Sequence, residues 1–362
     1  MATIYDVAKA AGVSPKTVSR VLNADAPVKK ETLDRVRRAI DELGYVPSSA
    51  ARSMRSNKSG LIGLITGAIS MKTNELDTNG LPDLFIVQGI QKAIEASGKT
   101  LLIADTGGKS ERVPDLIRTF EQHRVEGIIY VADYHRQVAL PEIGPEVKLV
   151  LANCHDERGT PSVLPHDRQG QYALVKSLIA KGHLRIAYLS LSANLDATRE
   201  RTAGYQDALR EAGIAYDPDL VIPSDIEVPD RETEVQLLWD AIDRVLSLPE
   251  KPTVLCFGND RMAMRGYGIL RSRGLDLPAD ISVAGYDNYR LITESLYPSL
   301  MSAELPYAAI GIRATQLLMK LLEGEDAPEK PILVGGPVTP GDSVRTLTTN
   351  VTKLSTVGRK TT

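Results

Sequence analysis

Residues 14–23, SPKTVSRVLN, combine side chains that can bind nucleic acid with the signals that start a helix. Ser14 has the chemistry of an N-cap, and Pro15 suits the first helical position, where no backbone donor is needed. A helix that buries Val18 presents on its opposite face Pro15, Lys16, Ser19 and Arg20. Such groups can contact base edges and phosphates, so this face predicts DNA binding. Periodicity and charge alone leave a merely solvated basic face as the alternative.

Two more helices are predicted around this segment. A helix over about residues 4–10 turns Val7 and Ala8 inward, and Gly12 permits a sharp turn before Ser14. The stretch 29–44, KKETLDRVRRAIDELG, ends at Gly44 and has helical spacing of Leu33, Val36, Ile40 and Leu43. A three-helix core is therefore expected.

Charge separates this unit from the remainder of the chain. Residues 1–60 contain 11 Lys and Arg against 6 Asp and Glu, a balance of +5. The whole chain has a net charge of −3, which leaves −8 for the remainder. A basic module on an acidic body predicts that only the first part contacts a polyanion.

From residue 61 onward, short apolar runs alternate with helical stretches. The runs are LIGLIT (61–66), TLLIAD (100–105), GIIYVA (127–132) and KLVLAN (148–153), followed by RIAYLS (185–190), TVLCFG (253–258) and ISVAGYD (281–287). This alternation predicts parallel sheets covered by helices. Because the pattern restarts, two lobes are expected, with a ligand bound between them at the carboxyl ends of the strands.

Several other classes of protein are disfavoured. No apolar run approaches the ~20 residues that span a membrane, and Asp6 interrupts the start of any secretory signal, so a cytoplasmic protein is expected. Cys154 and Cys256 lie in apolar runs typical of buried thiols, and the five histidines have no metal-ligand spacing. TGGKS (106–110) lacks the first glycine of a phosphate loop, and GYGILR (266–271) lacks the third glycine of a dinucleotide motif. We therefore expect no cofactor, no metal, no catalytic residues and no enzymatic activity.

TIYDVAKAAGVSPKTVSRVLN and RVRRAIDELGYVPSSAARSMRS resemble the DNA-binding headpiece and hinge of the LacI/GalR family of bacterial transcriptional regulators. The likeness continues through LIAKGHLRIAYLS, RTAGYQDAL, GNDRMAMRGYGILRSRGL and LPADISVAGYDN to GDSVR, over about 340 residues. It implies an α/β protein in which an N-terminal all-α helix-turn-helix headpiece precedes a two-lobed, periplasmic-binding-protein-like body with two parallel doubly wound sheets.

The resemblance implies a set of DNA contacts in the headpiece. Pro15, Lys16 and Arg20 match the family's base-reading positions in the major groove, where Lys16 can donate to guanine and Pro15 can touch a thymine methyl. The matches to positions that mostly touch phosphate or sugar are Thr3, Tyr5, Ser14, Thr17, Ser19 and Asn23. Those contacts fix the register of the protein on DNA.

The resemblance also implies a hinge helix in PSSAARSMRS that forms on DNA and pairs with that of a second subunit. Met54 takes the position of the apolar side chain that opens a base step in the minor groove, supported by Ala51 and Arg52. Without its neighbours, Met54 would read as an ordinary linker residue.

Effector residues carried over by resemblance are Arg201, Asn259, Asp260 and Asp287. Each has a simpler interpretation: Arg201 pairs with Glu200 or Glu211, Asp260 is an N-cap, and Asp287 with Asn288 forms a turn.

The first lobe supplies weaker effector candidates, Thr66, Asp83 and Asn153. Relatives often have stacking aromatics after the first strand, where this chain has Pro82 and Asp83. The missing aromatics put a purine in doubt and favour a small sugar, a mono- or disaccharide.

The expected domains are a headpiece (1–47), a hinge (48–60), an effector-binding and dimerisation body (61–345) and a disordered tail (346–362). Lobe 1 is expected over about 61–161 plus 293–325, and lobe 2 over about 162–292 plus 326–345. The helix 306–324 is expected to return to lobe 1. No leucine heptad follows Arg345, so a homodimer is predicted and not a tetramer.

Together these observations predict a repressor of carbohydrate uptake or catabolism genes that binds double-stranded, pseudo-palindromic operator DNA as a dimer. The hypothesis is that a small sugar changes the angle between the lobes and separates the hinges, as inducer or corepressor. The alternatives are a soluble sugar-binding protein and a regulator that responds to a purine or another metabolite.

Overall fold

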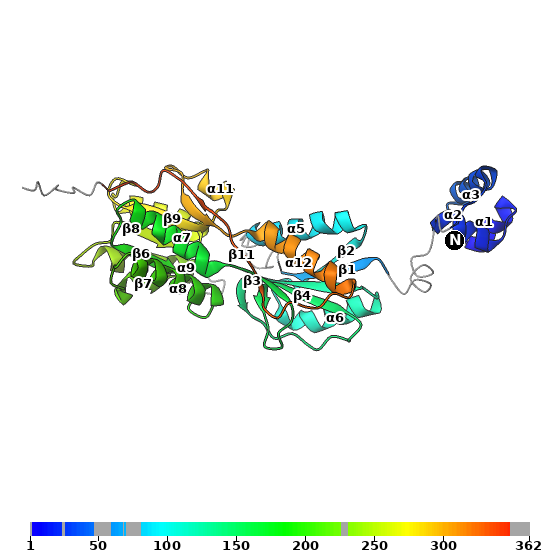
Figure 1. Cartoon of the computed structure of the whole chain (residues 1–362). Coiled ribbons are helices and arrows are strands. Elements are labelled where there is room, and N and C mark those ends of the chain that lie inside the picture. The colour runs from blue at the N-terminus through cyan, green and yellow to red at the C-terminus, as the bar shows by residue number, and fades with distance from the viewer. Residues whose placement is uncertain are drawn as a thin grey trace, which may run out of the picture.

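The structure is a computed structural model that describes residues 2–23, 26–46, 59–67, 69, 81–225 and 231–347. The headpiece consists of α1 (Ile4–Ala11), α2 (Pro15–Asn23) and α3 (Lys30–Leu43), drawn in dark blue in Figure 1. Val7, Val18 and Val36 form its core. Gly12 and Gly44 end α1 and α3 with left-handed φ values of 64° and 56°, which glycine adopts without strain.

One headpiece residue that was expected in the core lies outside it. Leu43 is 40% exposed, so the prediction that it is buried is wrong. The reason is length, because α3 has 14 residues whereas α1 and α2 have 8 and 9, and its last turn extends past them.

Lobe 1 is built on a parallel sheet with the strand order β11-β5-β4-β3-β1-β2. Its strands are β1 (Leu61–Thr66), β2 (Thr100–Asp105), β3 (Gly127–Gln137), β4 (Lys148–His155), β5 (Ser162–Pro165) and β11 (Ile332–Val334). Leu64 of β1 pairs with Ile103 on one side and Ile129 on the other. Strand β1 is buried almost throughout, as expected for a central parallel strand.

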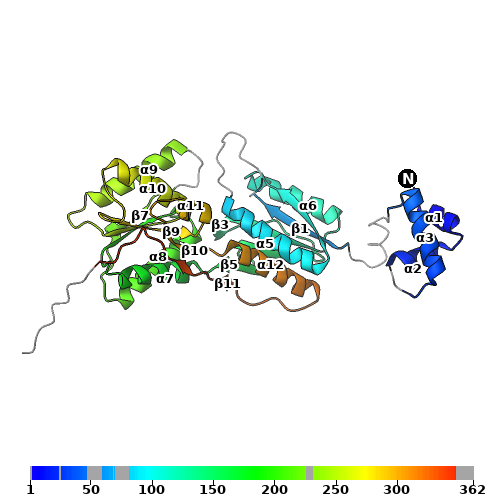
Figure 2. The ribbon, with the colours of Figure 1, turned by 90° about the horizontal axis from the view of Figure 1, so that it is seen from above.

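Helices cover both faces of this sheet. Helices α5 (Leu81–Ser97) and α12 (Tyr307–Leu322) pack side by side on one face, and α6 (Val113–Gln122), preceded by the short η1 (Ser110–Arg112), covers the other (Figures 1 and 2). Glycines let α5 and α12 approach closely, since a Cβ on Gly311 would lie 2.2 Å from the Ile86 carbonyl oxygen. The predicted return of the 306–324 helix to lobe 1 is confirmed.

Lobe 2 repeats this architecture with the strand order β12-β10-β9-β8-β6-β7. Its strands are β6 (Ile186–Ser190), β7 (Val221–Pro223), β8 (Val254–Phe257), β9 (Ser282–Asp287), β10 (Met301–Glu304) and the antiparallel β12 (Val338–Thr339). Its helices are α7 (Asp167–Ala180), α8 (Asp196–Glu211), η2 (Pro218–Leu220), α9 (Arg231–Leu246), α10 (Asp260–Ser272) and α11 (Arg290–Thr293). The expected fold class, with two largely parallel sheets, is confirmed.

The lobe boundaries differ from those expected. Strand β5 (162–165) joins the first sheet and β10 (301–304) the second, so the chain crosses near 166 and 305, not near 162 and 293. Strand β11 (332–334) also belongs to lobe 1, which moves the last crossing from 326 to about 336. These strands have only three or four residues, too few for an apolar run to reveal their sheet.

The C-terminal boundary also shifts slightly. The Leu347 N–H donates to the Lys181 carbonyl at 2.7 Å, so the folded body continues two residues past Arg345, and the remainder of the expected tail lies outside the described residues. Cys154 and Cys256 are free and buried, as predicted. None of the helices in the described ranges is long and apolar enough to cross a membrane.

Gly311→Ala should destabilise lobe 1, because the new methyl group would clash with the Ile86 carbonyl of α5. Overpacking costs about 1–3 kcal/mol, which exceeds the roughly 1 kcal/mol gained when glycine leaves a helix. The matched control is Gly268→Ala in α10, where nothing lies within 4 Å, and this variant should be neutral or stabilised. Chemical denaturation measures both, and equal stabilities would contradict the close packing.

Candidate DNA-binding and effector-binding sites

Helix α2 begins as its sequence predicts. The Thr17 N–H donates to Ser14 Oγ at 3.2 Å, which makes Ser14 the N-cap. Lys16 and Arg20 are exposed and lie one helical turn apart. The structure therefore presents two cations on the free face of α2, with Pro15 half-buried beside them.

Ser19 is a correction to the expected face. It is only 6% exposed, and the Asn23 amide donates to its hydroxyl at 3.2 Å. Ser19 follows the fully buried Val18 at the edge of the packed stripe, so its small side chain is covered with the core.

The first turn of α1 positions two other expected phosphate contacts. Thr3 caps α1, its backbone N–H donating to Asp6 Oδ2 at 2.8 Å, and the Thr3 hydrogen bonds lower the pKa of Asp6. Tyr5 is 71% exposed next to this cap. Thr3 is thus engaged in forming the helix start, whereas Tyr5 is open to a partner.

Ala51, Arg52 and Met54 of the expected hinge lie outside the described residues. The chain enters lobe 1 at Gly60, whose N–H donates to Glu126 Oε1 at 2.6 Å. Lys99 Nζ donates to the other Glu126 oxygen at 2.7 Å. This carboxylate fixes the point at which the headpiece connection meets the first sheet.

Arg201 lies in a buried network at the contact between the lobes. It is 3% exposed, its Nε donates to Asp167 Oδ1 at 2.6 Å, and its Nη1 donates to the Gly258 carbonyl at 2.6 Å. The guanidinium carbon lies 3.6 Å from the centroid of the Tyr286 ring. Pairing with Glu200 or Glu211 is therefore excluded, because the side chain points inward from α8.

Asn259 and Asp260 anchor neighbouring backbone. Asn259 is the N-cap of α10, accepting from the Met262 N–H at 2.8 Å, so the cap is not Asp260. Asp260 is 1% exposed and accepts from the Ser302 hydroxyl and the Tyr289 N–H, each at 2.7 Å. Burial and the Asp287 charge raise the pKa of Asp260 well above its usual range.

Asp287 ends β9 with a φ of 111° and lies where the two lobes meet. Tyr307, the first residue of α12, donates to its Oδ1 at 3.4 Å. Burial raises the pKa of Asp287 to about 7, although the nearby Arg201 opposes this shift. Asn288 also has positive φ, so the turn is present and holds the carboxylate at the junction.

The lobe 1 candidates differ in what they offer. Asn153 has a φ of 60°, is 2% exposed and donates to the Ala132 carbonyl at 2.9 Å, while its Oδ1 accepts no hydrogen bond. Thr66 is buried at the end of β1. The side chain of Asp83, in α5, lies outside what the structure describes. Asn153 therefore holds an unused acceptor.

Aromatic side chains do occur at the junction. Phe85 of α5 and Tyr289 have ring centroids 6.0 Å apart at 58°. Phe85 is 38% exposed. Helix α5 carries Phe85 to the junction two residues after Asp83, so lobe 1 offers an aromatic there, although not at the positions of Pro82 and Asp83. A sequence search for an aromatic next to the loop misses this helical position.

Two interlobe contacts were not predicted from the sequence. His135 Nδ1 and Asp167 Oδ2 lie 2.8 Å apart, and His155 Nε2 and Asp196 Oδ2 lie 2.9 Å apart. The histidines belong to β3 and β4 of lobe 1, and the aspartates begin α7 and α8 of lobe 2. Their signal in sequence is only a carboxylate at each helix start, which helix dipoles favour.

The two apparent nucleotide motifs form no phosphate site. In TGGKS, the Gly107 N–H donates to Asp105 and the Gly108 N–H to Thr106, so these amides are occupied. GYGILR lies inside α10. No group of three or more metal-ligating side chains occurs in the described ranges.

These features define a two-lobed α/β body joined to a helix-turn-helix unit. Residues 3–48 match the family described as "Bacterial regulatory proteins, lacI family", and residues 175–344 match a "Periplasmic binding protein-like domain". The chain belongs to the LacI family of bacterial regulatory proteins.

Individual relatives agree with this assignment. The HTH-type transcriptional repressor PurR of Vibrio atlanticus (strain LGP32) is 32% identical over 351 residues, covering 96% of this chain and 100% of the relative. A LacI-family regulator from Rhizobium etli has 31% identity and a TM-score of 0.69 over 80% of this chain and 100% of that one. A complex of the regulator CelR with cellobiose has 26% identity and a TM-score of 0.65 over 95% and 100%. The chain is thus a DNA-binding transcriptional repressor and not an enzyme.

Asp287→Asn should weaken the pH dependence of stability. With a pKa of about 7 in the folded state and about 3.9 when unfolded, Asp287 binds more protons in the folded protein between these values. Its contribution to stability is therefore lost as pH rises from about 4 to about 7. The variant's melting temperature should fall less than that of the wild type between pH 5 and pH 7, and an equal fall would contradict the raised pKa.

Proposed function

We propose that the chain is a cytoplasmic homodimeric repressor that binds pseudo-palindromic operator DNA and responds to a small molecule bound between its lobes. The exposed cations Lys16 and Arg20 on α2 support the proposed binding to DNA. In relatives of this kind each helix-turn-helix reads one half-site, so a dimer reads two. The expected hinge contacts of Ala51, Arg52 and Met54 belong to the same proposal.

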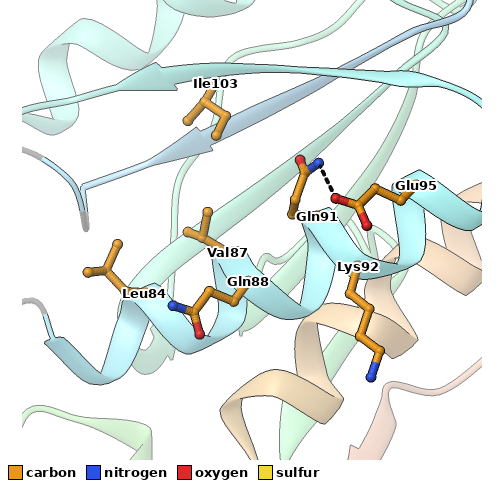
Figure 3. Close-up of a pocket in the computed structure, with 7 residues that line it drawn as sticks. All are labelled: Leu84, Val87, Gln88, Gln91, Lys92, Glu95 and Ile103. Atoms are coloured by element: carbon orange, nitrogen blue, oxygen red, sulfur yellow. Dashed lines mark hydrogen bonds between the residues drawn. The ribbon is translucent and has the colours of Figure 1, made fainter.

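The dimer is proposed to form through the outer face of α5 and β2. A groove there, of about 320 Å³, is lined by Leu84, Val87, Gln88, Gln91, Lys92, Glu95 and Ile103 (Figure 3). Ile103 is 45% exposed although it is a strand residue. Leu291 of lobe 2 is 65% exposed, and its helix α11 lies along the same upper side of the molecule as α5 in Figure 1. We propose that a second copy of the chain occupies this groove, because an operator with two half-sites needs two helix-turn-helix units.

Ile103→Glu should separate the subunits, because it places a carboxylate in an apolar contact. The molar mass measured by light scattering should fall from twice 39.3 kDa towards 39.3 kDa. Affinity for the operator found by in vitro selection with the wild type should fall at least tenfold. Leu184→Glu is the matched control, since Leu184 is 59% exposed in lobe 2 away from α5. An undiminished mass in Ile103→Glu, or selected DNA without two-fold symmetry, would refute the dimer.

We propose a small sugar as the effector. Its hydroxyls would meet hydrogen-bonding groups from both lobes: Arg201 and Asp287 from lobe 2, and the unused Asn153 oxygen from lobe 1. The relative CelR was solved with cellobiose, which favours the same ligand class. Asp260 and Asn259 anchor the backbone next to this site through their hydrogen bonds. Thr66 and Asp83 are the further candidates on the lobe 1 side. Because Arg201 and Asn153 are almost fully buried, effector binding requires the lobes to part.

A purine is the second candidate effector. The aromatic pair of Phe85 and Tyr289 at the junction could hold a flat ring between them. Curated relatives with 30–33% identity carry the name PurR. Sugars and purines are therefore tested together in one binding screen.

A thermal-shift screen of mono- and disaccharides and of purine bases should find a compound that raises the melting temperature by mass action. Arg201→Lys should lower the affinity for that compound at least tenfold, because one ammonium group cannot hold Asp167 and the Gly258 carbonyl, as Arg201 does, and also donate to a ligand. Arg210→Lys is the control, since Arg210 is exposed on the same helix. Equal affinities in the two variants would remove Arg201 from the site.

A further inference from the structure

The two oxygens of the Asp167 carboxylate face different lobes. Oδ1 accepts from Arg201 Nε of α8 in lobe 2, at 2.6 Å. Oδ2 lies 2.8 Å from Nδ1 of His135, which belongs to β3 in lobe 1. Asp167 itself is 1% exposed and begins α7, directly after the first chain crossing. One buried carboxylate thus joins a side chain of lobe 1 to the arginine expected to meet the effector.

The charge state of Asp167 suits this position. Burial alone would raise its pKa, but the Arg201 charge and the His135 hydrogen bond outweigh burial and lower the pKa. The carboxylate is therefore ionised, and an ionised buried carboxylate needs both partners. If lobe 1 moves away, Asp167 loses one of them while remaining attached to Arg201.

A second contact shows that this arrangement is particular to Asp167. His155 of lobe 1 meets Asp196 at 2.9 Å, but Asp196 binds Arg199, whose side chain is 67% exposed, and not Arg201. The His135 and His155 rings are neighbours, with centroids 6.2 Å apart. Both contacts therefore hold the lobes together, and only the first reaches the candidate effector site.

We propose that Asp167 is a positioning residue that couples Arg201 to the contact between the two lobes, with His135 as the lobe 1 partner. This inference rests on the proposed function in one respect, that Arg201 contacts the effector. Displacement of His135 changes the orientation of the shared carboxylate and hence that of the guanidinium. Linkage makes the coupling reciprocal, so a ligand that moves Arg201 also changes the contact between Asp167 and His135 of lobe 1.

The coupling can be measured without any effector by NMR of the full-length protein with labelled arginine and histidine. The Arg201 Nε–H resonance is assigned by its loss in Arg201→Lys. In His135→Leu this resonance should shift by more than its line width. In His155→Leu, the matched control that breaks the other interlobe contact, it should stay in place. His135→Asn, which keeps an N–H donor near the Nδ1 position, should return it towards the wild-type frequency.

The reciprocal measurement uses the imidazole signals, which are simple to assign because the chain has five histidines. Arg201→Lys should shift the His135 signal and leave the His155 signal unchanged, and this variant still tests the coupling if His135→Leu fails to fold. An unmoved resonance in either direction overturns the proposal. Equal shifts with His135→Leu and His155→Leu also overturn it, because the effect would then come from lobe contact in general. If no compound in the screen binds but the Arg201 and His135 resonances shift as expected, the proposed ligand site is overturned and the role of Asp167 stands.

Discussion

The ion pair between Asp167 and Arg201 is the interaction on which the junction between the lobes depends. A guanidinium that is 3% exposed has lost most of its water, at a cost of several kcal/mol, and is tolerated only with directed partners. Here those partners come from the start of α7, the end of β8 and the face of Tyr286 on β9. Three elements that are distant in sequence must therefore adopt one arrangement.

The same junction uses helix starts to place negative charge. Asp167 and Asp196 lie in the first turns of α7 and α8, where the helix dipole favours a carboxylate. Each faces a histidine from the neighbouring sheet. The lobes thus meet partly through polar contacts, beside the aromatic contact of Phe85 with Tyr289, and such polar contacts can part and re-form at lower cost than a large apolar interface.

Local signals in the sequence were sufficient for much of this fold. Ser14 and Pro15 predict the start of α2, and the apolar runs predict β1 and β2 at their observed bounds, because these features act within a few residues. The short strands β5, β10 and β11 were assigned to the wrong lobe, since pairing with a distant strand decides their place. In the site, resemblance led to Arg201 and Asp287, whereas Asp167 was missed because it lies 34 residues from Arg201. Ser19 was misjudged because helical geometry sets its exposure more finely than a residue pattern does. Phe85 was not considered, because it lies inside a helix and not in the loop after the first strand.

The three crossings between the lobes set the order in which the molecule can be completed during synthesis. Helix α12 and strand β11 of lobe 1 are made only after most of lobe 2, although α12 packs on α5 and β11 pairs with β5, both of which are made earlier. Until residue 322 leaves the ribosome, the face of α5 that carries Ile86 and Ile90 has no covering helix. The headpiece, by contrast, is complete by residue 46. A chain that stops early would therefore carry a finished DNA-reading unit on a body with an open apolar face, and such a body is a target for chaperones and proteases.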